Sequence, residues 1–192
     1  MKKSYIVIGI LVLLVLMGGC SYNGMNRSRV NVDEKWAGVQ SSYQRRADLI
    51  PNLVSTVKGA AEFEKSTLTA VIEARAKATQ MNVNAGDLTP EKMQEFQAAQ
   101  GQLSQALGRL MVVSEQYPQL KANQNFLALQ DQLEGTENRI KVSRDDFNGA
   151  VSTYNVKVTS FPANIMAGMF GFKEKPMFKA DEGAQSAPKV EF

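Results

Sequence analysis

The residues of this chain with the most evident chemistry lie in one short run, residues 43–59. Two arginines, Arg45 and Arg46, are followed by an aspartate, Asp48, and a proline, Pro51. Arginine binds carboxylates and phosphates through a planar fork of N–H donors, so such a cluster could contact the acidic groups of a partner or the headgroups of lipids. These four residues are therefore candidates for a structural or partner-binding role.

Most catalytic chemistry is missing from the sequence. The chain contains no histidine, which excludes Ser-His and Cys-His nucleophile pairs and histidine-ligated metals. Carboxylates on facing helices hold two metals in some bundles, but those sites use a Glu-x-x-His motif. A carboxylate pair doing acid–base work needs one pKa raised in a cleft, and no cleft is indicated. We expect a protein that is not an enzyme and that holds neither metal nor cofactor.

The charge balance argues against a nucleic-acid partner. The 192 residues include 22 Lys and Arg against 19 Asp and Glu, and no basic cluster stands out beyond the N-terminal pair Lys2 and Lys3. Binding to a phosphate backbone depends on clustered cations that displace counterions. With 44% hydrophobic residues the chain is long enough for one globular domain with a core.

The N-terminus has the pattern of an export or anchor segment, which we assign to residues 1–21. Lys2 and Lys3 precede an apolar run at residues 5–17, and Gly18 and Gly19 lead to the single cysteine, Cys20. The run is shorter than the roughly 20 apolar residues of a typical spanning helix. Two interpretations stay open: a lipoprotein signal with lipidation at Cys20, and an uncleaved single-pass helix. Both place the body on the extracytoplasmic side of the membrane, because the basic residues flank the N-terminal end.

After a polar stalk at residues 22–30, apolar residues recur at helical spacing through the remainder of the body, residues 31–172. The stripe of the first rod comprises Trp36, Val39, Tyr43, Ile50, Leu53, Val57, Leu68 and Val71. Its phase continues across Pro51. Proline removes one backbone hydrogen bond and clashes with the preceding turn, so we expect a kink near Ala47, with Asp48 capping the new start.

Two further rods follow an interruption at residues 82–91. Thr89 before Pro90 predicts a helix start, and the helix should extend to about Gln116. A longer helix then begins at Pro118 and reaches about Val158. No stretch in the body alternates as a strand would. The fold class is therefore all-α: an elongated antiparallel helical bundle behind an N-terminal hydrophobic anchor.

The stripe position of Arg46 predicts burial, and a buried arginine needs a partner. Four glutamates are candidates for an ion pair across the bundle: Glu64, Glu115, Glu134 and Glu137.

The apolar segment 160–172 admits two interpretations. It is a cap folded over the bundle end, or an exposed patch for a partner or a bilayer surface, with Phe161, Pro162, Phe170 and Phe172 as candidate contacts. The polar residues 173–192 are expected to be disordered.

These stretches together resemble the LemA family of bacterial envelope proteins. The residues that carry the resemblance are Tyr22, Asn23, Trp36, Arg45, Arg46, Asp48, Leu49, Ile50, Pro51, Asn52, Leu53, Val54, Val57, Lys58, Gly59, Glu73, Ala74, Arg75, Glu115, Tyr117, Pro118, Leu120, Ala122, Phe126, Leu129, Leu133, Glu137, Ile140, Arg144, Asn148, Tyr154, Asn155, Phe161, Pro162 and Phe172. Phe147 departs from the tyrosine often found there, and Cys20 adds a lipidation site to a family usually anchored by a plain membrane helix.

The resemblance implies an all-α body, described for the family as a four-helix bundle, attached to the membrane by its N-terminus. Three rods become four helices if the kink at Pro51 divides the first. The family has no established catalytic activity, and its members are associated in some cases with a membrane-bound zinc metalloprotease. We therefore expect a membrane-anchored, non-enzymatic helical interaction protein of the bacterial cell envelope with a protein partner. The alternative is a self-assembling structural spacer or coat protein of the envelope.

Overall fold

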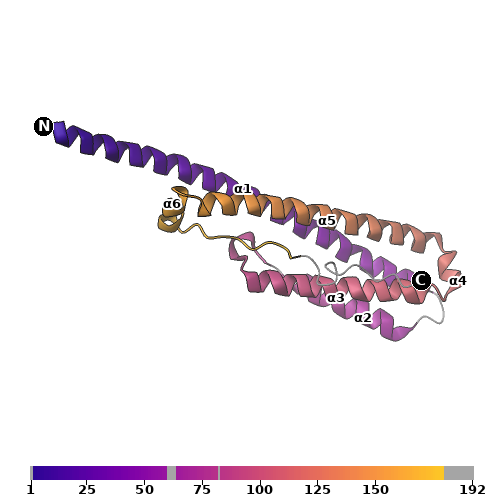
Figure 1. Cartoon of the computed structure of the whole chain (residues 1–192). Helices are drawn as coiled ribbons and strands as arrows, with labels where there is room; N and C mark the ends of the chain where they lie inside the picture. The colour runs from indigo at the N-terminus through magenta and orange to yellow at the C-terminus, as the bar shows by residue number, and fades with distance from the viewer. Residues whose placement is uncertain (1, 60–63, 82, 180–192) are drawn as a thin grey trace, which may run out of the picture.

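The computed structural model describes residues 2–59, 64–81 and 83–179, and these form a long helical bundle without strands (Figure 1). Four helices are long: α1 (Lys2–Lys58), α2 (Lys65–Gln80), α3 (Pro90–Ser114) and α5 (Gln124–Thr159). Two are short, α4 (Pro118–Lys121) and α6 (Ala163–Phe170), and a 3-10 turn, η1 (Ala85–Asp87), joins α2 to α3. The all-α expectation is confirmed, whereas the described residues contain six α-helices rather than four.

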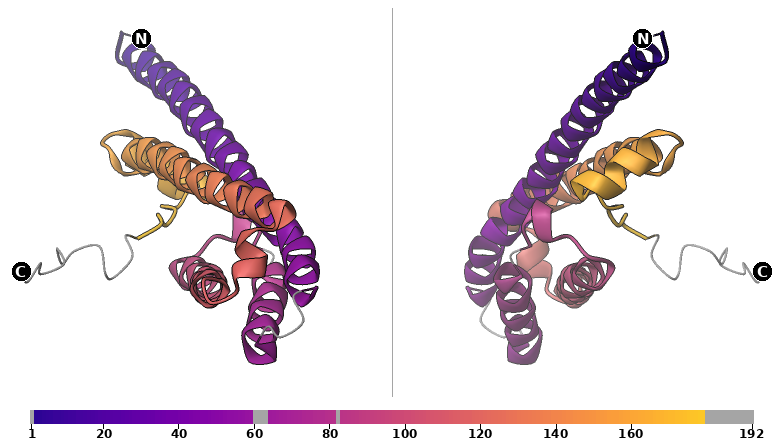
Figure 2. Two further views of the ribbon diagram at one scale, coloured as in Figure 1. Left: turned by 90° about the vertical axis from the view of Figure 1, so that its right-hand side faces the viewer. Right: turned by 90° about the vertical axis from the view of Figure 1, so that its left-hand side faces the viewer.

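The long helices alternate in direction. In Figure 1, α2 runs back along α1, α3 reverses again, and α5 returns beside α1. Figure 2 shows α1 packed on α5 as one pair and α2 beside α3 as the other. The whole of α1, 57 residues at about 1.5 Å each, is roughly 85 Å long. Its N-terminal part extends beyond the bundle, and α6 lies at that same end.

The apolar stripes predicted from the sequence form the core. Every stripe residue of the first rod is buried, and so are the apolar positions of α3 and α5 that repeat at near-heptad spacing. They divide into two clusters. The first, around Trp36, lies toward α6, and the second, around Leu53, lies toward α4.

The helix ends follow local sequence signals. Thr89 accepts a hydrogen bond from the backbone N–H of Lys92, which caps α3 with Pro90 in its first turn, as predicted. Asn123 caps α5 in the same way through the amides of Asn125 and Phe126. Capping therefore sets where the two central helices begin.

The prediction that a kink at Pro51 divides the first rod into two helices is wrong. Helix α1 continues through Pro51 to Lys58, and the first rod divides after Gly59, beyond which α2 starts at Lys65. Asp48 does not cap a new helix; its Oδ1 accepts from Nε2 of Gln44, one turn earlier, at 2.7 Å.

No helix formed by the described residues is long and apolar enough to cross a membrane. The predicted anchor segment falls largely outside what the structure describes, because most side chains of residues 5–17 are not placed.

Candidate functional site

Arg46 is a fully buried charge in the middle of the bundle. Its side chain is 1% exposed and lies between the two core clusters, since Tyr43 belongs to one and Ile50 to the other. Its Nη1 donates to Glu137 Oε1 at 2.6 Å and to Ser104 Oγ at 2.8 Å.

A second set of contacts completes the surroundings of this guanidinium. Nη2 of Arg46 donates to Gln100 Oε1 at 2.6 Å, and the guanidinium carbon lies 5.1 Å from the centre of the Tyr43 ring. In the part of the chain that the structure describes, Nε is left without a hydrogen-bond partner. Arg46 thus joins α1 to α3 and α5, and its burial prevents contact with an outside partner.

Of the four glutamates that could neutralise Arg46, Glu137 does so. Its side chain is 46% exposed, so water still solvates the carboxylate while one oxygen bonds the guanidinium. A half-exposed carboxylate needs less desolvation than a buried one, which favours the pair.

Arg45 and Asp48 lie on the opposite side of α1, facing solvent. They line an open groove of about 590 Å³ between α1 and α5, together with Gln132 and Arg139. The two adjacent arginines therefore have different surroundings: Arg46 is buried and joins three helices, and Arg45 is exposed to solvent.

Pro51 has no backbone N–H, so α1 lacks one hydrogen-bond donor at this position, and a side chain of another helix takes the place of that donor. A proline at position 51 cannot donate to the carbonyl of Ala47, four residues back. Nε of Arg75, on α2, donates to that carbonyl at 2.8 Å. Because of Pro51, the carbonyl of Ala47 is free to accept a hydrogen bond from α2, and this bond ties α2 to α1. The carbonyl is satisfied in this way, which is consistent with α1 continuing as a helix past Pro51.

Residues 173–179, which the sequence assigns to a disordered tail, are instead an extended segment on the bundle; we call it the strap. Asn155, on α5, bonds both the N–H and the carbonyl of Lys175, each at 2.9 Å. Asn148, one heptad earlier, bonds the N–H of Phe178 at 2.9 Å and its carbonyl at 3.2 Å. Residues 180–192 lie outside the described part of the chain.

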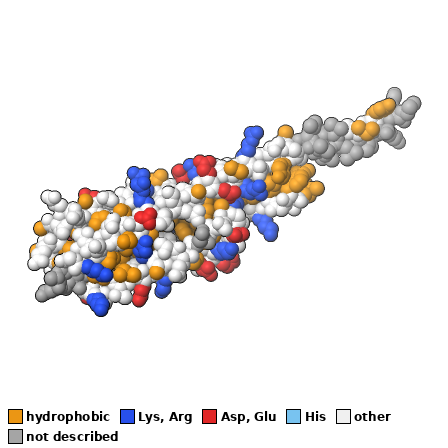
Figure 3. All heavy atoms as spheres, turned by 180° about the vertical axis from the view of Figure 1, so that it is seen from behind, with side chains coloured by type: hydrophobic (Ala, Val, Ile, Leu, Met, Phe, Trp, Pro, Cys, Tyr) orange, Lys and Arg blue, Asp and Glu red, His pale blue; other side chains and the backbone are white. Residues whose placement is uncertain are grey.

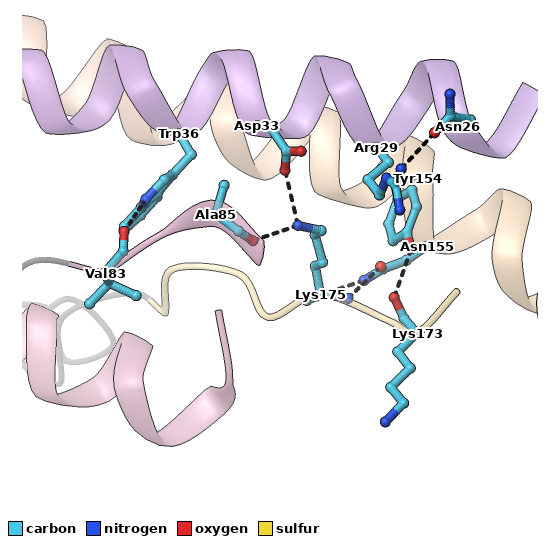
Figure 4. Close-up of polar contacts among 10 residues, drawn as sticks. All are labelled: Asn26, Arg29, Asp33, Trp36, Val83, Ala85, Tyr154, Asn155, Lys173 and Lys175. Atoms are coloured by element: carbon cyan, nitrogen blue, oxygen red, sulfur yellow. Dashed lines mark hydrogen bonds and ion pairs between the residues drawn. The ribbon is translucent and has the colours of Figure 1, made fainter. Parts of the chain in front are cut away.

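Figure 4 shows how the strap is held beside α1. Nζ of Lys175 donates to Asp33 Oδ1 at 3.1 Å and to the carbonyl of Ala85 at 2.7 Å. The hydroxyl of Tyr154 donates to the carbonyl of Lys173 at 2.9 Å. One lysine of the strap therefore joins α1 to the turn before α3.

The surroundings of Tyr154 change its acidity. Burial raises the pKa of its hydroxyl above the ordinary value of 10.0; the positive charge of Arg29 opposes this, and the negative charge of Asp33 adds to it. The hydroxyl therefore stays protonated, and able to donate to the strap, to a higher pH than an unperturbed phenol.

The strap also completes the aromatic core. The Phe178 ring is 6% exposed and lies 5.5 Å from the Phe147 ring, 6.0 Å from Trp36 and 6.4 Å from Phe96, measured between centroids. The indole N–H of Trp36 donates to the carbonyl of Val83 at 2.8 Å (Figure 4). The strap is thus part of the fold.

The four candidate contacts of segment 160–172 have different exposures. Phe161 and Pro162, joined by a cis peptide bond, are exposed, and Phe161 is 79% exposed. Phe170 is half exposed and meets the Tyr22 ring edge-on at 5.1 Å, whereas Phe172 is buried beneath Tyr22 and Arg29. Figure 3 shows hydrophobic side chains gathered at the end of the bundle from which α1 extends.

The remaining candidate, Cys20, is exposed on α1, two residues before Tyr22. Among the described side chains, no group of three or more Cys, Asp or Glu residues could hold a metal ion.

Sequence reasoning assigned no role to Arg75, Asn148, Asn155, Lys175 or Phe178. The spacing of the two asparagines was a usable signal, because residues seven apart lie on one face of a helix. Their partners were not visible, since both bond main-chain atoms of a distant segment.

The chain is similar in sequence to magnetosome MamQ proteins and to a LemA protein. It is 28% identical over 175 residues to magnetosome protein MamQ 2 of Paramagnetospirillum magneticum, and 26% identical over 174 residues to magnetosome protein MamQ of Magnetospirillum gryphiswaldense. These matches cover 82% of this chain but only 64% of each MamQ protein, so the chain spans less than two thirds of those relatives. It is 22% identical over 160 residues to protein LemA of Metamycoplasma hominis, a match that covers 83% of this chain and 69% of that protein.

The family model of the LemA family matches residues 35–192, a region that contains the Arg46 site, the hydrogen bond from Arg75 to the carbonyl of Ala47, α6 and the strap. That region is well over half of the chain, and the chain therefore belongs to the LemA family.

Proposed function

We propose that the protein is a membrane-associated, non-enzymatic helical interaction protein of the bacterial cell envelope, anchored by its N-terminus with the bundle on the extracytoplasmic side. One observation carries the proposal: α1 is a single helix that joins the apolar residues 5–17 directly to the bundle core. Whatever holds those residues therefore also positions the bundle.

The groove beside Arg45 gives a surface for a protein partner. It is open, lies between α1 and α5, and presents Arg45, Asp48 and Arg139 to solvent. A mixture of charges suits a polar partner surface and gives specificity. A membrane-bound metalloprotease is one partner to test, as the resemblance implies.

Fractionation of cells that make the full chain tests the membrane part of the proposal. The chain should sediment with membranes after a high-salt wash, and a freely soluble chain would refute it. Cys20→Ala separates the two anchors: an unchanged mass and location supports a single-pass helix, whereas accumulation of an unlipidated precursor supports a lipoprotein.

Crosslinking in intact cells tests the interaction part. A reproducible partner should be captured by the native chain and lost with Arg45→Glu, while Lys77→Glu, an exposed change on α2, retains it. Adducts containing only further copies of this chain would favour the alternative, a self-assembling spacer or coat protein.

A further inference from the structure

The exposed face of α6 is apolar and regular. Phe161, Ile165 and Met169 are 79%, 54% and 72% exposed and follow one another at intervals of four residues. Ile165 and Met169, four residues apart, lie along one side of α6, and Phe161 lies in the turn just before the helix; we call these three exposed residues the stripe. The opposite side packs on the bundle through Ala167, which is 3% exposed.

The stripe lies where α1 leaves the bundle. Met166, on α6, lies over Gly18 of α1, where an added Cβ would be in ordinary van der Waals contact with the methionine sulfur at 3.6 Å. One helical turn later on α1, Tyr22 contacts Phe170. The apolar run ends at Met17, so the contact between Met166 and Gly18 places α6 beside the end of that run.

The charges around α6 suit a membrane surface. No charged residue lies between Lys157 and Lys173, so the helix is uncharged along its length and has a lysine on either side in the chain. Interfacial helices bury an apolar face at the boundary of headgroups and acyl chains, and basic residues next to them lie near the anionic headgroups. In this protein Lys157 and Lys173, outside α6, would be those basic residues.

We infer that α6 lies on the bilayer surface, with Phe161, Ile165 and Met169 in contact with lipid beside the N-terminal anchor. This inference rests on the membrane association proposed above. It holds for either anchor, since Cys20 is two residues from Tyr22, which contacts Phe170, and the apolar run ends five residues from it. The contact would fix how the bundle stands on the membrane.

A photo-crosslinking experiment on the full chain tests the inference. The chain is reconstituted into vesicles of phosphatidylethanolamine and phosphatidylglycerol, with p-benzoylphenylalanine replacing either Met169 or Val142. Val142 is the matched control: it is 54% exposed but lies on α5, about 25 Å along the helix from its C-terminal end. After flotation and irradiation, the probe at position 169 should give a phospholipid adduct several-fold more abundant than the probe at 142.

The outcomes separate the inference from the proposed function. A chain that floats with the vesicles but gives no lipid adduct at position 169 overturns the inference alone. An adduct with the mass of two chains also overturns it, because a second copy then covers the stripe. A chain that does not float overturns both proposals.

A second variant guards against a probe that merely disturbs α6. With the probe at Phe161, Ile165→Glu should abolish most of the lipid adduct, and Val142→Glu should leave it unchanged. An adduct insensitive to Ile165→Glu would contradict a shared contact face.

Discussion

The contact between Arg75 and the carbonyl of Ala47 makes a specific prediction about Pro51. Arg75→Met keeps the aliphatic stem but removes the Nε donor, so the carbonyl of Ala47, a residue only 3% exposed, loses its partner. A hydrogen bond from a charged donor contributes about 1.5–3 kcal/mol. The substitution should therefore lower the free energy of unfolding by that amount.

The same substitution should be almost harmless when residue 51 has an amide. In a Pro51→Ala background the new N–H bonds the carbonyl of Ala47 within α1, so Arg75→Met should cost at most about 0.5 kcal/mol. Pro51→Ala alone should stabilise the protein, by less than the roughly 3 kcal/mol that an interior proline costs, because Arg75 already bonds the carbonyl.

Urea unfolding followed by helical circular dichroism, on the full chain in mild detergent, measures all four members of this double-mutant cycle. A loss of 1.5–3 kcal/mol corresponds to roughly 3–12 °C in melting temperature for a chain of this size. Lys77→Met, an exposed change on the same helix, is the control and should have little effect. Equal costs of Arg75→Met in the two backgrounds would refute the reasoning, since the residue would then stabilise α2 by some other contact.

Three further predictions concern the core and the strap. Arg46→Ala strands the partners of a buried guanidinium and should cost about 3–5 kcal/mol in urea unfolding, whereas Arg45→Ala should stay within about 0.5 kcal/mol; similar costs would contradict their different burial. Phe178→Ala should release the strap and speed amide hydrogen exchange at residues 173–179, while Met177→Ala, an exposed neighbour, should not; unchanged protection in the first variant would show that the asparagines suffice. Because the pKa of Tyr154 is raised in the folded state, the folded protein binds this proton more tightly, so stability should fall as the pH rises above about 10. Tyr154→Phe should make that fall shallower in unfolding curves measured between about pH 8 and pH 11, and parallel curves would contradict the raised pKa.

Periodicity predicted most of the fold. The stripe through Trp36, Tyr43, Ile50 and Val57 is buried as expected, because a helix presents residues at this spacing on one side whatever its neighbours are. The same phase predicted that Arg46 is buried and paired, and Glu137 was among the partners named.

The features that were missed depend on distant contacts. The division of the helix was expected at Pro51 because proline has no amide to donate to the carbonyl of Ala47. The sequence does not reveal that Nε of Arg75, on another helix, donates to that carbonyl instead. The actual division of the first rod follows Gly59, and glycine is common just after helix ends. The strap has a polar, disorder-like composition, and it is ordered by Asn148 and Asn155 on α5.

The position of the strap in the chain also bears on the order of assembly during synthesis. The six α-helices of the described residues precede it, and the Phe178 ring that closes the aromatic cluster around Trp36 is made after them. While the earlier residues emerge from the ribosome, the far cluster around Leu53 already has all its members, but the Trp36 cluster does not. The end of the bundle next to the N-terminal segment is therefore the last to close, so the first helix to be synthesised is the one that waits longest for its surroundings to be complete.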